Sequence, residues 1–600
     1  MSAKDILQNI FSVKNEYGEH NCHKVINILG IKVKLKRGKN QIPANLKKTP
    51  VNTFATIHYV ASMLKAYGIR HIVASPGAQN SGFNRLVSAN DDFFICHSVV
   101  DERSAVYVAT GIANETGEPV VITCTGATAS RNYLSGMTES FYRNIPIIAL
   151  TCFNPHINKF SLSPQYLDRS YTQNDIKKIS VKLPRILDNV SRYTCLTYLN
   201  AALTAAKYKN EPVQIDCPST YASAITTETL PENIWTTKYY FNNFENQKQE
   251  LKNKRIAIFI GSHHKFNIET QNAISDFAKS YCAPVFCDHT SNYNGENKIS
   301  VSQLTMLVDI KKYPEIIIDI GGISGNYTLY PLYKNAKVWR ISEDGDFKCR
   351  MNHPVSKIFA CTEKRFFQTM KNNIGLIFED YYAQLKTLQN SIKIPDLPLS
   401  TPLIAQHYAK CIPNNSSLHL AILHSLRCMN LFNLDKSINV NCNVGGFGID
   451  GAVSTLVGQS LANPDKKCFG LIGDLAFFYD MNAIGNRDIK NNLRILLVNN
   501  NRGEEFNLAI LKGLKQKNNN LDKIIAAMGH NRGGAKGWAQ ACGFEYFSAN
   551  SKDEFLSLIN DFCNKDFNKP VFFEVLTTNE DEIKGLELIK KYNKGEDKNE

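Results

Sequence analysis

The feature that most constrains the fold of this chain is a pair of short apolar segments that end in polar residues. One apolar segment ends in Gly473-Asp474, and a second, over residues 493–498, ends in Asn499-Asn500. The interval between them fits one helix, so the pattern predicts two parallel strands joined by a crossover helix. Because the carboxyl ends of parallel strands meet at one edge of a sheet, we expect Asp474 and Asn500 at neighbouring strand tips.

An acid and an amide at such an edge suit a magnesium ion bound to a diphosphate. Mg²⁺ takes about six oxygen ligands, and proteins usually supply one or two carboxylates while phosphate and water complete the shell. We expect the Asp474 carboxylate, the Asn500 amide oxygen and the backbone carbonyl of Arg502 to be ligands. A helix starting near Ala476 would direct N–H groups at the phosphates, and Gly473 would let the backbone approach them. An ordinary strand–turn–helix crossover is the alternative, so a second half of the site is needed.

A candidate for that second half lies near residue 100. Residues 99–105 follow a β-like run over residues 93–96 and open a helix through Gly111 that is apolar on one side. Glu102 stands in the first turn of this helix. Taken alone, an acid there is explained by the helix dipole, which a carboxylate stabilises by roughly 0.3–1 kcal/mol.

Several motifs occur in the order seen in thiamine-diphosphate-dependent enzymes, the superfamily of pyruvate decarboxylase and acetolactate synthase. They include Ser75-Pro76-Gly77, residues 101–105, residues 123–129, residues 448–451 and Gly473-Asp474-Leu475. Within that superfamily the chain resembles SEPHCHC synthase, the 2-oxoglutarate-decarboxylating ligase of menaquinone biosynthesis. The resemblance covers roughly residues 50 to 580.

The resemblance implies thiamine diphosphate and Mg²⁺ as cofactors. It implies that Glu102 hydrogen-bonds the aminopyrimidine ring of the cofactor and that Ile449 holds the cofactor in a bent shape. It also implies a homodimer or homotetramer, in which the two halves of each site come from different subunits. The expected cofactor-binding residues are Pro76, Gly77, Glu102, Thr128, Gly448, Ile449, Asp450, Gly473, Asp474, Leu475, Ala476, Asn500 and Phe506, and the expected metal ligands are Asp474, Asn500 and Arg502.

Length and composition agree with a large α/β enzyme. The chain has 600 residues, of which 43% are hydrophobic and 21% charged, so several sizeable cores are possible. Neither a bilayer-spanning apolar run nor a signal peptide is apparent. The scattered cysteines form no C-x-x-C pair, which favours free thiols and a cytoplasmic location. His263-His264 is a weak metal candidate, because adjacent side chains point apart.

Strand-like runs alternate with helical patterns along most of the chain, as in parallel α/β units. We therefore predict an α/β fold with three doubly wound parallel sheets. The expected divisions are a basic extension (1–49), a pyrimidine-binding domain (50–225), a middle domain (226–395), a diphosphate- and Mg²⁺-binding domain (396–585) and a charged tail (586–600). The glycine-rich stretch 321–325 lacks dinucleotide-binding spacing, so a flavin or nicotinamide is not expected.

The first 49 residues lie outside the predicted enzyme core. Lysine alternates with apolar residues over residues 23–37, which predicts a β-hairpin with one basic face. This segment resembles leader segments of surface-polysaccharide glycosyltransferases, and that resemblance implies docking on an anionic membrane surface or on a pathway enzyme. A charged, solubilising hairpin is the alternative. The net charge of +14 suits anionic substrates or a membrane surface, and nothing indicates nucleic-acid binding.

The chain departs from SEPHCHC synthase where that family uses arginines to bind anionic substrates. Motif by motif, Gln79, Asn154 and Val444 stand where the family has arginines. The family's Lys-Arg pair in the middle domain falls near Asn326-Tyr327 of this chain. Arg427 and Gln165 match retained family residues. A lost charged hydrogen bond typically costs about 1.5–3 kcal/mol, which argues against isochorismate as the substrate. The expected substrate-binding residues are Gln79, Asn80, Asn154, Gln165, Arg427 and Val444.

Glu505 falls where a residue would face the reacting carbon of the cofactor, so it is a candidate to orient a substrate or to transfer a proton. The alternative is that Glu504 and Glu505 form a solvated helix start. We take Glu102, Gln165 and Glu505 as the catalytic candidates. The expected activity is decarboxylation of a 2-oxo acid, with transfer of the acyl anion to an aldehyde, enoyl or sugar acceptor or with aldehyde release, in surface-polysaccharide biosynthesis. The alternatives are SEPHCHC synthase and a non-catalytic cofactor-binding scaffold.

Overall fold

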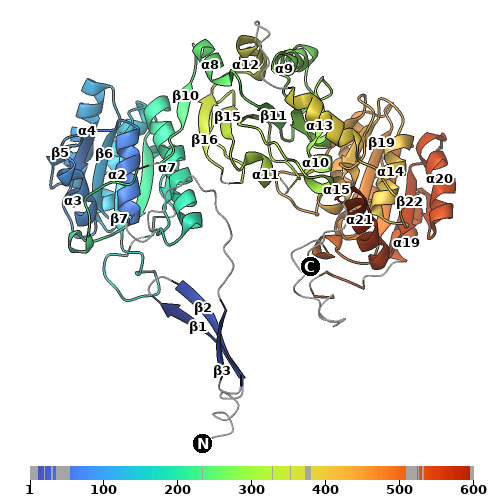
Figure 1. Ribbon diagram of the computed structural model, residues 1–600, viewed down its shortest axis with the longest axis horizontal. Helices are drawn as coiled ribbons and strands as arrows, with labels where there is room; N and C mark the ends of the chain where they lie inside the picture. The colour runs from blue at the N-terminus through green and yellow to red at the C-terminus, as the bar shows by residue number, and fades with distance from the viewer. Residues whose placement is uncertain are drawn as a thin grey trace, which may run out of the picture.

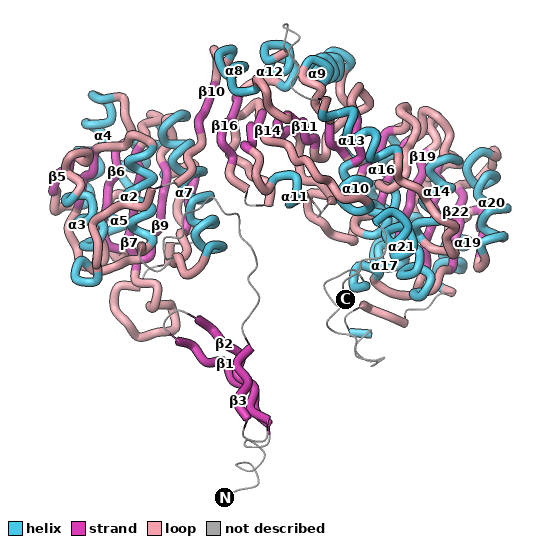
Figure 2. The backbone as a smooth tube through the Cα atoms, viewed as in Figure 1, coloured by secondary structure: helices cyan, strands magenta, loops and turns pink. Residues whose placement is uncertain are grey.

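Three α/β domains follow one another along an arch (Figure 1). The computed structural model describes residues 11–18, 21–28 and 31–35, and then 54–594 except for 167, 170, 233, 327–328, 352, 372–379, 508–522, 525 and 530–532. Each domain contains one parallel sheet covered by helices on both faces (Figure 2). The predicted fold class is therefore confirmed.

The first domain, called the pyrimidine-binding domain here after the sequence-based expectation, is built on a six-stranded sheet of order β5-β4-β6-β7-β9-β8. Its strands are β4 (His71–Ala74), β5 (Ile95–Ser98), β6 (Val120–Thr125), β7 (Ile147–Phe153), β8 (Ile179–Lys182) and β9 (Val213–Pro218). Its helices are α2 (Thr56–Ala66), α3 (Ser81–Ala89), α4 (Glu102–Thr116), α5 (Ala129–Asn132), α6 (Leu134–Tyr142) and α7 (Asn189–Lys209). Alternate residues of β6 enter separate cores on opposite faces of the sheet, which explains why the strand reads as a continuous apolar run.

The middle domain has a seven-stranded sheet of order β10-β16-β15-β14-β11-β12-β13. Its strands are β10 (Lys238–Tyr240), β11 (Ile256–Ile260), β12 (Val285–Cys287), β13 (Lys298–Ser300), β14 (Ile316–Ile320), β15 (Lys337–Ile341) and β16 (Val355–Phe359). Its helices are α8 (Lys248–Leu251), α9 (Ile268–Ser280), α10 (Val301–Leu307), α11 (Tyr330–Tyr333), α12 (Glu363–Met370) and α13 (Tyr381–Asn390), with the short turn η4 (His289–Ser291). Two apolar cores again enclose the sheet.

The third domain, called the diphosphate-binding domain here after the sequence-based expectation, has a six-stranded sheet of order β18-β17-β19-β20-β22-β21. Its strands are β17 (Ser417–Leu420), β18 (Asn439–Asn441), β19 (Cys468–Gly473), β20 (Leu493–Asn499), β21 (Glu545–Ala549) and β22 (Val571–Leu576). Its helices are α14 (Thr401–Cys411), α15 (His424–Met429), α16 (Ala452–Ala462), α17 (Asp474–Asp480), α19 (Gly534–Ala541), α20 (Lys552–Asn564) and α21 (Asn579–Lys594), with the turn η6 (Glu504–Asn507).

The structure differs from the sequence-based prediction in one strand number and one boundary. The N-terminal extension forms a three-stranded antiparallel sheet of β1 (Phe11–Gly18), β2 (Asn21–Ile28) and β3 (Ile31–Leu35), one strand more than the predicted hairpin. The predicted domain end at residue 585 falls inside α21, because Ile589 is fully buried in the core of the diphosphate-binding domain and extends the helix. The charged tail predicted for 586–600 is therefore helical as far as Lys594.

In the part of the chain that the structure describes, no helix combines the length and apolarity needed to cross a membrane. Every cysteine whose side chain is described is free. His263 and His264 stack on each other, and no cluster suited to a metal ion forms around them among the described residues.

Candidate active site

The polar tips of β19 and β20 lie side by side. The two strands pair in parallel, with Gly473 opposite Val498. The Asp474 carboxylate is buried and accepts a hydrogen bond from the backbone N–H of Asn501 at 2.7 Å. The crossover predicted from the sequence thus brings the acid of one strand against the turn that follows the other.

The turn after β20 orients its own polar groups. The Asn500 amide nitrogen donates to Glu504 Oε2 at 2.7 Å, and the Asn500 amide oxygen accepts from the backbone N–H of Arg502 at 3.2 Å. Asn500, Arg502 and Glu504 are all at most 8% exposed. Because a carboxylate, an amide oxygen and a backbone carbonyl are the oxygen donors that Mg²⁺ prefers, the residues present fit a magnesium diphosphate.

The backbone at the tip of β19 is open around the Cα atom of Gly473. A Cβ added at Gly473 would meet no atom within 4 Å, so the tip of β19 opens onto unfilled volume. The neighbouring loop is held in place by Ser454 at the start of α16, whose backbone N–H and hydroxyl both donate to Asp480 at 2.6 Å. Ile449 in this loop packs against both cores of the domain, whereas Asp450 is exposed.

Glu505 forms a two-pronged ion pair with Arg427 of α15. The guanidinium donates from Nη1 to Glu505 Oε2 at 2.6 Å and from Nη2 to Oε1 at 2.9 Å. The side chains are 12% and 21% exposed. The alternative of a solvated helix start is therefore wrong, since Glu504 is buried and Glu505 is paired. Phe506 follows in η6, and its side chain lies outside the described residues.

Glu102 begins α4 in the pyrimidine-binding domain. Asn132, the last residue of α5, donates from its amide to Glu102 Oε2 at 2.9 Å. Among the described residues Oε1 accepts no hydrogen bond, so it stays available to a ring nitrogen. The sequence did not indicate Asn132, because its link to Glu102 spans 30 residues without any periodic signal.

The loop after β4 is tightly built. A Cβ added at Gly77 would overlap the Thr125 methyl group, so this loop needs glycine. Asn80 is fully buried and uses both ends of its amide within the loop, donating to the Ser75 carbonyl at 3.1 Å and accepting from the Gly77 N–H at 2.9 Å. The structure therefore places Asn80 as a support of the loop. Pro76 beside it is exposed.

The remaining candidates divide between two places. Gln79 is buried, accepts from the Gly126 N–H and donates to Gln165 Oε1 at 3.1 Å, so these two candidates are brought together. Thr128 stands exposed just before α5, and Asn154 caps its own turn by accepting from the His156 N–H. Val444 is buried in the diphosphate-binding domain, where it faces the middle-domain loop at Gly325.

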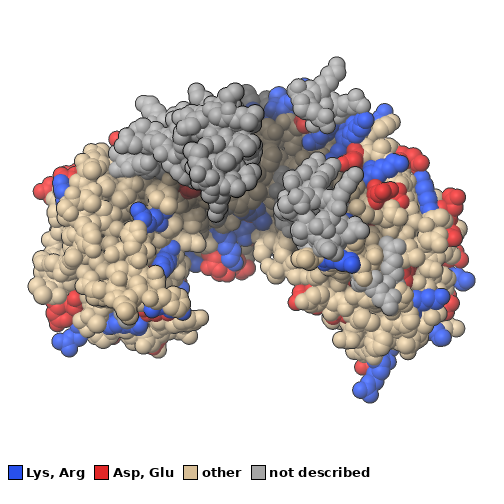
Figure 3. Space-filling model, turned by 90° about the horizontal axis from the view of Figure 1, so that it is seen from below, with Lys and Arg blue, Asp and Glu red and all other residues tan. Residues whose placement is uncertain are grey.

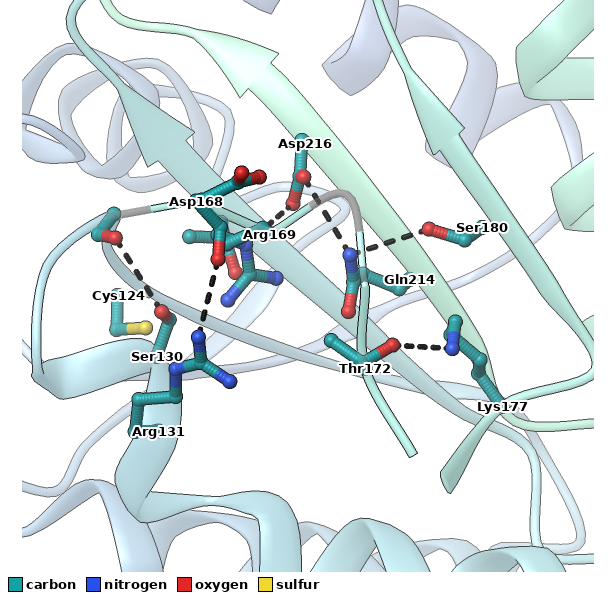
Figure 4. A network of polar contacts seen from close by, with 12 residues as sticks. Cys124, Ser130, Arg131, Asp168, Arg169, Thr172, Lys177, Ser180, Gln214 and Asp216 are labelled. Carbon is teal, nitrogen blue, oxygen red and sulfur yellow. Dashed lines mark hydrogen bonds and ion pairs between the residues drawn. The ribbon is translucent and has the colours of Figure 1, made fainter. Parts of the chain in front are cut away.

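The loop that carries Gln165 is anchored by a residue that the sequence did not reveal. Arg169 donates to Asp216 at 2.9 Å, and both side chains are at most 10% exposed. Arg131 holds the Asp168 carbonyl of the same loop at 3.1 Å (Figure 4). Burial raises the pKa of the Asp216 carboxyl group, and the positive charge of the neighbouring Arg169 opposes this increase. Separating Arg169 from Asp216 would leave a buried charge without its partner. The pair therefore holds the loop in its position beside Gln79.

The two halves of the site stand at opposite ends of the arch. The domain of α4 and the domain of β19 are separated by the middle domain in Figure 1. Figure 3 shows a hollow between these two lobes, with both basic and acidic side chains at its edge. One chain therefore does not bring Glu102 and Asp474 together.

Comparisons with known proteins agree with this geometry. Residues 55–179 match the N-terminal TPP binding domain of thiamine pyrophosphate enzymes. The chain is 29% identical over 573 residues to the 2-succinyl-5-enolpyruvyl-6-hydroxy-3-cyclohexene-1-carboxylate synthase (SEPHCHC synthase) of Phocaeicola vulgatus, covering 90% of this chain and 98% of that protein. It is 28% identical over 480 residues to the synthase of Flavobacterium johnsoniae, covering 76% and 85% of the two chains.

By its fold and by these matches, the chain is similar to thiamine-diphosphate-dependent enzymes. Within that class its relatives are SEPHCHC synthases, to which it is similar over nearly their whole length. The comparisons thus favour the SEPHCHC synthase alternative over a role in surface polysaccharides, for which they contain no indication.

Proposed function

We propose that this protein uses thiamine diphosphate and Mg²⁺ to decarboxylate a 2-oxo acid and to transfer the resulting acyl anion to an acceptor. The observation that carries this proposal is that Asp474 and Asn500 lie at the tips of adjacent parallel strands, with the Asp474 carboxylate accepting from the Asn501 N–H at 2.7 Å. The relatives are synthases, which favours carbon–carbon bond formation over simple aldehyde release. When bound, thiamine diphosphate supplies the electron sink that makes such a decarboxylation possible.

The chain's own residues divide the work between the two half-sites. Asp474, Asn500 and the carbonyl of Arg502 would hold Mg²⁺ and, through it, the diphosphate. Glu102, steadied by Asn132 on one oxygen, would accept a hydrogen bond from the aminopyrimidine with the other. Ile449 lies at the loop where an apolar contact would support the ring system, because it packs across both cores of its domain.

A complete site in this proposal requires two copies of the chain. Glu102 lies in the first domain of the arch and Asp474 in the third (Figure 1). The first domain also exposes large apolar side chains that suit a subunit contact, namely Val100, Tyr107, Val108 and Tyr142. A homodimer, or a tetramer made of two such dimers, would place Glu102 of one subunit beside Asp474 of another.

Two kinds of substrate fit this reaction class. SEPHCHC synthase activity is the second candidate, and the full-length similarity to those enzymes supports it. The ion pair at the site supports a different substrate, because Glu505 neutralises the one arginine that matches the family pattern. A substrate with fewer negative charges, or one that hydrogen-bonds Glu505, is what this pair would accommodate.

One assay distinguishes SEPHCHC synthase activity from the reaction of a different substrate. The purified protein, with thiamine diphosphate and Mg²⁺, is incubated with 2-oxoglutarate and isochorismate, and in parallel with other 2-oxo acids and aldehydes, while CO₂ and products are measured. We expect CO₂ release with at least one 2-oxo acid and little SEPHCHC product. Efficient SEPHCHC formation would establish the second candidate, and absence of both cofactor binding and CO₂ release would refute the reaction class.

The N-terminal extension belongs to the same proposal. We place the enzyme in the cytoplasm, with residues 1–49 contacting an anionic membrane face or a pathway enzyme. The basic composition of residues 23–37 supports this contact. Vesicles with and without anionic lipid, sedimented with the full chain and with a chain lacking residues 1–49, test it, and equal sedimentation of both chains would count against it.

A further inference from the structure

A cavity of about 230 Å³ lies where the middle and diphosphate-binding domains meet. Its walls come from η4, β13 and α13 of the middle domain and from the segment after α15 of the other domain. It contains none of the residues assigned above to cofactor or substrate. It is smaller than the ~300–1,000 Å³ pockets that hold drug-sized ligands, so its occupant would be small.

The cavity walls are held rigidly across the domain boundary. His289 Nε2 donates to the carbonyls of Met429 and Phe432 at 3.0 and 2.9 Å, and the His289 backbone N–H donates to Asn430 at 3.0 Å. The Ser300 hydroxyl donates to the Asn430 carbonyl at 3.1 Å. The cavity is thus a built feature of the interface.

Three lysines line this cavity. Lys298 and Lys386 belong to the middle domain, and Lys436 belongs to the diphosphate-binding domain. Within the part of the chain that the structure describes, their ammonium groups make no ion pair or hydrogen bond. Like charges around one small cavity repel each other, so an anion would be favoured there.

The other ionisable groups of the cavity do not offset these charges. Asp288 is the one acid lining it, and its carboxylate accepts from the Thr290 N–H at 2.9 Å and from the Ser324 hydroxyl at 2.8 Å. Burial, with the charge of Lys298, lowers the pKa of His289 to about 4, so this histidine is neutral at pH 7. Three ammonium groups and one carboxylate leave an excess of positive charge.

From this cavity, its three lysines and its position, we infer a binding site for a small dianion that bridges the middle and diphosphate-binding domains. The ligand class is a compact dicarboxylate or a phosphate group, either of which presents two negative charges to several ammonium groups. Since the lysines come from both domains, a bound dianion would hold the domains together. Binding would therefore raise the melting temperature of the protein.

The test uses the full chain saturated with Mg²⁺ and thiamine diphosphate, so that the diphosphate site is already filled. Inorganic phosphate and succinate are titrated separately by calorimetry and thermal unfolding. The variant is Lys298→Gln/Lys386→Gln, and the matched control is Lys410→Gln/Lys490→Gln, which removes the same charge from exposed lysines elsewhere.

We expect one of the two probes to bind the wild type and the control alike, and to bind the cavity variant at least about tenfold more weakly. The probe that binds identifies which source of charge the site accepts. No binding of either probe to the wild type at about 10 mM, or equal affinity of the cavity variant and the control, would overturn the inference. The measurement needs no turnover, so it is independent of the proposed reaction.

Discussion

The Arg427–Glu505 pair lends itself to a quantitative test, because it joins α15 to the turn that follows Asn500. Its two charge-assisted hydrogen bonds measure 2.6 and 2.9 Å, and its side chains are 12% and 21% exposed. A hydrogen bond to a charged group contributes about 1.5–3 kcal/mol. Allowing for the partial exposure, we expect Glu505→Gln or Arg427→Met to weaken local stability by about 2 kcal/mol.

Amide hydrogen exchange followed by mass spectrometry measures this effect where it occurs. A loss of about 2 kcal/mol corresponds to roughly thirtyfold faster exchange in peptides covering α15. The double variant should exchange little faster than either single variant, because the interaction is lost only once. Peptides covering α9 in the middle domain should be unchanged.

A matched control is the exposed pair of Arg143 and Glu139, whose side chains are 55% and 44% exposed at a separation of 3.3 Å. Arg143→Met should change exchange hardly at all, because such surface pairs contribute little. Exchange in α15 that stays within about twofold of the wild type in both single variants would refute the argument that this pair is a firm part of the site.

Three further predictions concern other parts of the molecule. Glu102→Gln should lower CO₂ release by about a hundredfold or more with an unchanged circular dichroism spectrum, and retained activity would remove Glu102 from the site. Asn80→Ala should cost about 1–3 kcal/mol in urea unfolding, because it leaves the Ser75 carbonyl and Gly77 N–H without their partner; lost activity at full stability would instead indicate a substrate contact. Burial lowers the pKa of His419 to about 4. The unfolded chain therefore binds a proton from about pH 6.5 downward while the folded chain does not, and stability should fall between about pH 6.5 and 4 by on the order of 3 kcal/mol. His419→Leu should flatten that part of a urea-midpoint profile, and an unchanged slope would contradict the assignment.

Sequence patterns anticipated the elements with good accuracy where a strand is buried on both faces. The apolar segment expected to end at Gly473 is β19 (Cys468–Gly473), and the expected strand over residues 493–498 is β20 (Leu493–Asn499). A buried parallel strand must be apolar on both sides, so its ends are marked by polar residues. The sequence predicted the end of the last helix less accurately, because α21 is half exposed and its charged residues continue past residue 585.

The position of the metal half-site follows from the same local rule. Asp474 and Asn500 each stand just past the end of an apolar run, and parallel pairing of those two strands suffices to bring them together. The primary structure by itself thus determined the fold class, the class of cofactor and the two strand tips that would hold its diphosphate.

Only the tertiary structure decided which polar groups meet around those tips. Glu505 pairs with Arg427 across 78 residues, Glu102 with Asn132 across 30, and Arg169 with Asp216 across 47. None of these separations follows a helix or strand period, since the packing of whole elements sets them. Polar partners of this kind are chosen by burial, because a charge removed from water must find its counterpart in whatever element the fold places beside it.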